Sequence, residues 1–91
     1  MTADDVIKFA YTAVREDLSY TQVEEWLHTY FKAWTASCLW VDLHFFIKRA
    51  KILKTFEEEG WPTNLLKYTL EEIKEALYTN IPRTLEYTKG E

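Results

Sequence analysis

The chain has 91 residues, so we expect one small domain that buries only about 60 to 65% of the surface of its unfolded chain. Its formal net charge of −4 disfavours broad electrostatic attraction to nucleic-acid phosphate or to anionic lipid. The single cysteine, Cys38, excludes an internal disulfide framework and a multi-cysteine zinc site, and a hydrophobic content of 47% is too high for a disordered chain.

A first amphipathic helix is predicted from about residue 3 to 18. Thr2 and Asp5 have the spacing of a capping box, in which each side chain accepts a hydrogen bond from the backbone N–H of the other residue. Apolar residues then recur at helical spacing and form one stripe, at Val6, Ile7, Ala10, Tyr11, Val14 and Leu18.

A second, very long helix is predicted from about residue 22 to 59. Thr21 and Glu24 give another capping-box pattern, and the next strong stop signal is Gly60 followed by Pro62. Between them, apolar residues follow alternating steps of four and three, with one step falling on Lys48 or Arg49, at Leu27, Phe31, Trp34, Cys38, Val41, Phe45, Ile52 and Phe56. This spacing favours one continuous helix. A break near residues 35 to 38, which would give a four-helix bundle, is the alternative.

A third helix is predicted from about residue 63 to 79. Thr63 can cap it, although Thr69 with Glu72 offers a competing start. Pro82 opposes continuation of the helix, so we expect residues 81 to 91 to form an extended or frayed tail. The predicted fold is therefore all-α, a single helical domain over residues 1 to 91 with a long central helix and two shorter flanking helices.

The middle of the long helix is apolar nearly all round, and two helices of half its length cannot surround it. A second copy of the chain is the simplest way to cover the remaining surface, so we expect a homodimer. The residues predicted for this self-association are Phe31, Trp34, Cys38, Val41, Asp42, Phe45, Arg49 and Ile52.

Asp42 is the unusual member of this set, because it lies in one of the most apolar stretches of the chain. In an antiparallel dimer centred between Phe45 and Phe46, Asp42 would face Arg49 of the second copy, and such a buried pair can fix the orientation of two helices. The alternative is that Asp42 accepts a hydrogen bond from one of the flanking helices or reaches water.

No motif indicates catalysis or a cofactor. Glu25 and His28 have the Glu-x-x-His spacing of di-iron carboxylate bundles, but they lie off the apolar stripe and favour a solvated face. His44 is expected at the edge of the apolar region, half-exposed and with one hydrogen bond. We therefore predict that the chain is not an enzyme and needs no metal or cofactor.

Lys48, Lys51 and Lys54 form the basic cluster that could contact nucleic acid. The net charge and the acidic run Glu57–Glu59 disfavour this interpretation. The preferred prediction is a small protein–protein interaction module, such as an adaptor, inhibitor or assembly subunit, that serves a larger protein partner. The acidic N-terminus and the lack of a 20-residue apolar run predict a cytoplasmic protein without a membrane segment.

Overall fold

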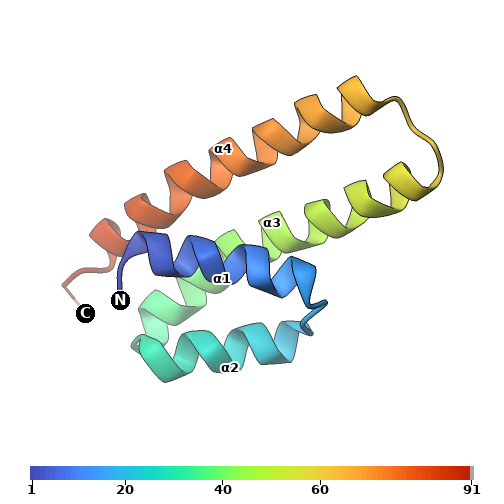
Figure 1. Cartoon of the computed structure of the whole chain (residues 1–91). Helices are drawn as coiled ribbons and strands as arrows, with labels where there is room; N and C mark the ends of the chain where they lie inside the picture. Colours follow the sequence, from blue (N-terminus) through green and yellow to red (C-terminus); the bar gives the residue numbers. More distant parts are fainter. Residues whose placement is uncertain (91) are drawn as a thin grey trace.

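The computed structural model describes residues 1–90, which contain four α-helices joined by short connections. They are α1 (Ala3–Arg15), α2 (Tyr20–Tyr30), α3 (Ala33–Glu58) and α4 (Thr63–Tyr87). The long helices α3 and α4 form an antiparallel hairpin, and α1 and α2 pack at the end of the hairpin far from its loop (Figure 1). The all-α prediction is confirmed, and the arrangement of three helices is replaced by four.

The start of α1 is as predicted. The Asp5 carboxylate accepts a hydrogen bond from the Thr2 backbone N–H at 2.9 Å, and the Thr2 hydroxyl accepts one from the Asp5 N–H. The helix ends at Arg15 rather than at residue 18, because Asp17 adopts a left-handed conformation with φ of 51°. The Leu18 N–H then donates to the Ala13 carbonyl at 2.9 Å, which closes the helix with a Schellman turn.

The capping box of α2 is formed by Ser19 and Gln22, and the predicted pair Thr21 and Glu24 is not used. The Gln22 side chain accepts from the Ser19 N–H at 2.8 Å, and the Ser19 hydroxyl accepts from the Gln22 N–H at 3.2 Å. The two pairs lie two residues apart and both have the spacing of a capping box, so the local sequence does not indicate which pair forms the cap.

The predicted continuous helix over residues 22 to 59 is wrong, because the chain turns at Phe31 and Lys32. Both residues have extended backbone, with ψ of 155° and 161°. The alternative break near residues 35 to 38 correctly anticipates four helices but lies too late, since α3 is regular from Ala33. The turn contains neither glycine nor proline, and it places Leu27 before it and Ala36 after it in one core.

The end of the long helix is predicted correctly. Gly60 takes a φ of 83°, which glycine adopts without steric cost, and the Trp61 N–H donates to the Phe56 carbonyl at 3.1 Å. The rings of Phe56 and Trp61 stack at 4.4 Å between centroids, which supplies the apolar contact that accompanies this turn.

The predicted end of the last helix is wrong, because α4 passes through Pro82 and continues to Tyr87. Residues 81 to 87 are therefore helical, while Glu91 lies outside the described residues. A proline in a helix interior costs about 3 kcal/mol. That cost is offset by packing on both sides of it: Ile81 is fully buried, Leu85 packs on the core, and the Thr84 hydroxyl donates to Asp42.

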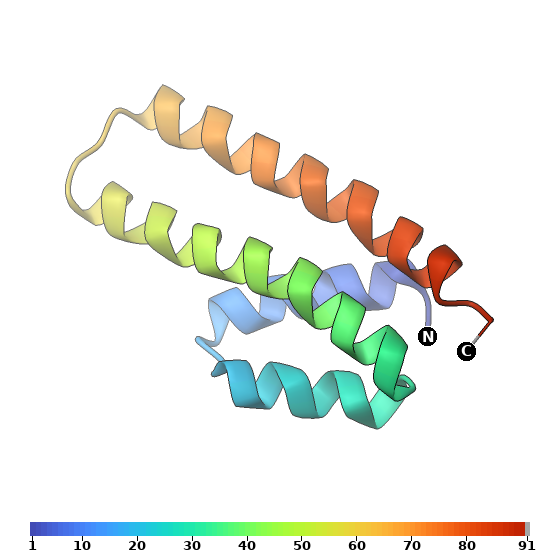
Figure 2. The same cartoon turned by 180° about the vertical axis from the view of Figure 1, so that it is seen from behind.

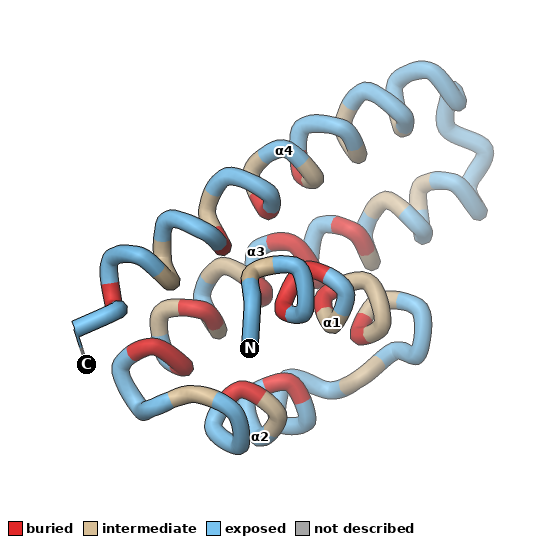
Figure 3. Tube along the Cα trace, turned by 60° about the vertical axis from the view of Figure 1, so that its left-hand side comes forward, coloured by how far each residue is buried: buried red, intermediate tan, exposed pale blue. Residues whose placement is uncertain are grey.

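The core lies where all four helices meet. Its inward residues on α3 are Ala36, Leu39, Leu43, Phe46 and Ile47, and the other helices contribute residues such as Val6, Leu27, Ile73 and Ile81. Beyond this region the hairpin is open, because residues 51 to 72 include no fully buried side chain (Figure 3). The loop end of the hairpin thus lacks a core of its own.

Candidate functional site

Helix α3 carries apolar side chains on two opposite faces. One face holds Leu39, Leu43 and Ile47 and is buried against the other helices. At about 100° per residue, a second set of residues points to the opposite side. Seen from behind, α3 lies in front of α1 and no helix covers this side (Figure 2).

We name the exposed apolar residues of this second face the outer stripe: Trp34, Val41, Phe45 and Ile52. Their exposed fractions are 46%, 62%, 40% and 42%. From Trp34 to Ile52 the stripe spans 19 residues, or about 27 Å of helix. Single exposed apolar residues are ordinary on protein surfaces, but several large ones on the same face of one helix are typical of an interaction surface.

The structure brings most of the predicted self-association residues to this face. Cys38 lies between Trp34 and Val41 on the helix and is half-buried. The Trp34 ring meets the ring of Tyr87 edge-on at 5.3 Å, so the C-terminal end of α4 borders the stripe. Phe31 is different, because it precedes α3 and packs against Trp26 with 6.5 Å between ring centroids.

Asp42 and Arg49 flank the stripe on the side of α4. The Thr84 hydroxyl donates to the Asp42 carboxylate at 2.6 Å, which is the alternative expectation of a hydrogen bond from a flanking helix. Burial raises the pKa of Asp42, and the hydrogen bond from Thr84 partly opposes that rise. The Arg49 guanidinium lies 3.8 Å from the centre of the Phe45 ring, where it makes a cation–π contact.

The three lysines of the basic cluster occupy three different environments. Lys48 is exposed, whereas Lys51 bonds the Asp17 carboxylate at 2.9 Å and donates to the Leu18 carbonyl at 3.2 Å. This contact with Lys51 lowers the pKa of Asp17. Lys54 lines a groove between α1, α3 and α4. The cluster therefore does not form one open basic face.

A ring cluster beside the stripe was not predicted. His44 stacks on Trp40 with 4.7 Å between ring centroids and lies 4.4 Å from the Tyr20 ring, which links α2 to α3. Within residues 1–90, His44 Nδ1 and Trp40 Nε1 are buried without a hydrogen-bond partner. Trp40 and His44 are four residues apart, which makes them neighbours on one face of a helix, and this spacing is the feature of the sequence that indicates their contact.

The Glu-x-x-His pair lies on the solvent side of α2, where Glu25 and His28 are both exposed. Within residues 1–90, no group of three or more His, Cys, Asp or Glu side chains is placed to hold a metal ion. Among the same residues, no helix combines the length and the apolar character that a membrane crossing requires.

Comparison with models of protein families, with curated proteins and with solved structures finds no match to this chain.

Proposed function

We propose that this chain is a helical protein–protein interaction module that forms a homodimer through the outer stripe of α3. The exposure of Trp34, Val41, Phe45 and Ile52 along one line of the helix carries the proposal. The fold supplies the physical reason: α1, α2 and α4 cover the Leu39 face and leave the opposite apolar face in solvent. A surface that is costly to hydrate is stabilised when a second copy covers it.

The energy available from the stripe suits a dimer that responds to concentration. Full burial of a large apolar side chain stabilises by about 1.5 to 3 kcal/mol, so covering the exposed part of each stripe residue contributes roughly 1 kcal/mol. A two-fold dimer covers the stripe twice, for roughly 8 kcal/mol in total. Association itself costs about 4 to 15 kcal/mol, so the stripe alone does not lock the dimer.

An antiparallel arrangement of the two α3 helices adds an electrostatic contribution. Asp42 is half-buried, and the Thr84 hydroxyl that donates a hydrogen bond to it is neutral. In a dimer centred near Phe45, Arg49 of the second copy would supply the cation that this carboxylate lacks. Such a pair selects the orientation of the helices more than it strengthens the dimer.

The test is the solution mass measured by light scattering behind a sizing column over a wide concentration range. We expect the mass to approach that of two chains as concentration rises. Val41→Glu should shift the protein to a monomer, because it places a carboxylate in the centre of the stripe twice per dimer. Leu65→Glu is the matched control, since Leu65 is an exposed apolar residue of α4 outside the stripe.

Two results would contradict the proposal. One is a mass of a single chain at every concentration for the unmodified protein. The other is a dimer that dissociates as readily with Leu65→Glu as with Val41→Glu, which would show that apolar surface in general, and not the stripe, drives association. Far-UV circular dichroism of each variant verifies that the helices remain folded.

A further inference from the structure

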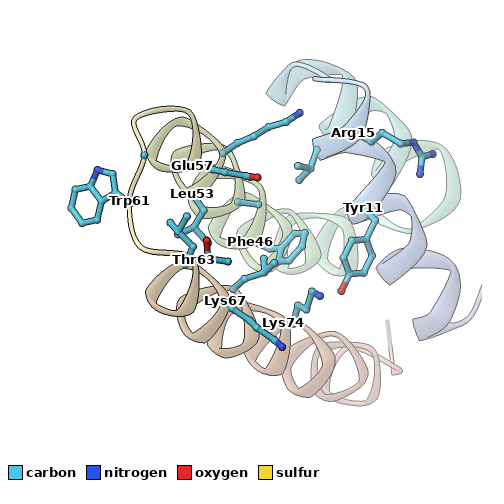
Figure 4. A pocket seen from close by; sticks show the side chains of 15 residues that line it. Tyr11, Arg15, Phe46, Leu53, Glu57, Trp61, Thr63, Lys67 and Lys74 are labelled. Carbon is cyan, nitrogen blue, oxygen red and sulfur yellow. The ribbon is translucent and has the colours of Figure 1, made fainter.

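A groove of about 950 Å³ lies between α1, α3 and α4, on the opposite side of α3 from the outer stripe. Tyr11 and Arg15 line it from α1, Phe46 and Leu53 from α3, and Lys67 from α4 (Figure 4). Its floor is apolar and consists of Val14, Phe46, Ala50, Leu53, Leu66 and Leu70. The groove therefore extends from the core, at Phe46, toward the loop end of the hairpin, where Leu53, Leu66 and Leu70 are only partly buried.

The groove exists because the helices differ in length. With 13 residues α1 is about 20 Å long, whereas α3 with 26 residues is about 39 Å long. Helix α1 ends at Arg15, and the residues of its last turns form one wall of the groove. Beyond that point the α3–α4 pair continues without a third helix against it. The open space thus lies beside the last turns of α1, over a stretch of α3 and α4 that neither α1 nor α2 covers.

The charges around the groove oppose those of the molecule as a whole. Four cationic residues line it, namely Arg15, Lys54, Lys67 and Lys74, against one carboxylate, Glu57, while the whole chain carries a net charge of −4. In residues 1–90, none of the three lysines makes a salt bridge. Burial and a hydrogen bond with Tyr78 raise the pKa of Tyr11 to about 12, so this phenol stays neutral at physiological pH.

We propose that the groove binds an acidic amphipathic α-helix of a partner protein. The apolar side of such a helix would cover Leu53, Leu66 and Leu70, and its flanking carboxylates would meet the lysines of the rim. Recognition by an apolar stripe in a groove is a common mode of helix binding, and complementary charge selects the partner and its orientation. This site lies apart from the outer stripe, so it does not depend on homodimer formation.

The probe is a fluorescein-labelled helical peptide of about 15 residues, or roughly four turns, with leucines on one face and glutamates beside them. The control peptide has the same leucines with lysine in place of glutamate. Fluorescence anisotropy should show saturable binding of the glutamate peptide and none of the lysine peptide. The binding should weaken as salt is added, because the rim charges are exposed.

Variants locate the binding site. Lys67→Glu combined with Lys74→Glu should weaken binding at least about tenfold, because both charges then repel the peptide. Lys48→Glu is the control, since Lys48 is exposed outside the groove, and the single variants Lys67→Glu and Lys74→Glu match its change in charge. Leu53→Ser provides a second variant, which removes an apolar side chain from the floor without adding charge to the groove. Circular dichroism reports whether each variant keeps its helices, and binding is repeated with Val41→Glu protein to separate it from self-association.

Equal binding of the two peptides would overturn the proposal, as would unchanged binding to the Lys67→Glu, Lys74→Glu protein. Absence of peptide binding together with saturable binding of dodecanoate would also overturn it, because the groove would then be a site for small amphiphilic carboxylates. Binding that is specific for the glutamate peptide and is lost in the groove variants, while Lys48→Glu leaves it intact, would support the proposal.

Discussion

Ile81→Ala tests whether the C-terminal end of α4 is part of the folded core. Ile81 is fully buried although it directly precedes Pro82, where the sequence predicts that the helix has already ended. Truncation of a fully buried isoleucine to alanine costs about 2 to 5 kcal/mol, and we expect about 3 kcal/mol here. A domain of this length has a total stability of roughly 5 to 14 kcal/mol, so the loss is a large share of it.

The assay is urea unfolding followed by far-UV circular dichroism, with thermal unfolding as a second measurement. At about 4 to 8 °C per kcal/mol for a domain of this size, the expected loss lowers the Tm by roughly 12 to 24 °C. The control is Arg83→Ala, because Arg83 is exposed in the same turn of α4, and we expect a change within about 0.5 kcal/mol. A cost for Ile81→Ala no larger than that for Arg83→Ala would refute the packing of this segment.

Three further predictions concern single contacts. Burial raises the pKa of Asp42, so the ionised form of this residue destabilises the fold. Asp42→Asn should therefore raise the Tm at neutral pH. This gain over the unmodified protein should vanish as the pH falls below the ordinary pKa of aspartate, because Asp42 is then protonated in the folded and the unfolded chain. Lys51→Met should cost about 1 kcal/mol in urea unfolding, because the Leu18 carbonyl loses its charged donor. Gly60→Ala should cost about 1 kcal/mol in the same measurement, because the φ of 83° is unfavourable for alanine although no atom obstructs its methyl group.

Two helix boundaries with a local chemical signal, the start of α1 and the end of α3, were predicted correctly. The Thr2 capping box and the Gly60 turn need only backbone groups and side chains within a few residues, so the sequence contains all the information that determines them. The turn at Phe31 and Lys32 has no such signal. It forms because Leu27 and Ala36 can both reach the core only if the chain reverses, and this is a property of the whole fold.

Pro82 shows the opposite case, a local signal overruled by distant contacts. Proline opposes the helix through its own backbone, but Ile81 and Leu85 pack against the core and Thr84 bonds a residue 42 positions earlier. The sequence reveals the local cost of Pro82 directly, whereas the stabilising contacts appear only once α3 lies beside α4. The groove was missed for the same reason, since its walls come from three helices and depend on where α1 ends.

The spacing of apolar residues in α3 is compatible with two different buried faces. The spacing predicts that the series from Trp34 through Val41 and Phe45 to Ile52 is the packed face, yet the buried face of the folded chain is that of Leu39, Leu43 and Ile47. A helix with apolar residues on opposite sides yields two valid periodic series, and periodicity alone does not say which one the chain itself covers. The exposed series is nevertheless the one predicted for self-association.

The two surfaces of α3 have a joint consequence. The outer stripe and the groove lie on opposite sides of this helix, so a dimer formed through the stripe would leave the groove of each chain open to solvent. Such a dimer would present two groove sites whose separation is fixed by rigid helices. A partner with two acidic helices at a matching distance would then bind far more tightly than a single helix, because the second contact becomes intramolecular. Self-association and partner binding, which are independent in their contacts, would thereby reinforce each other.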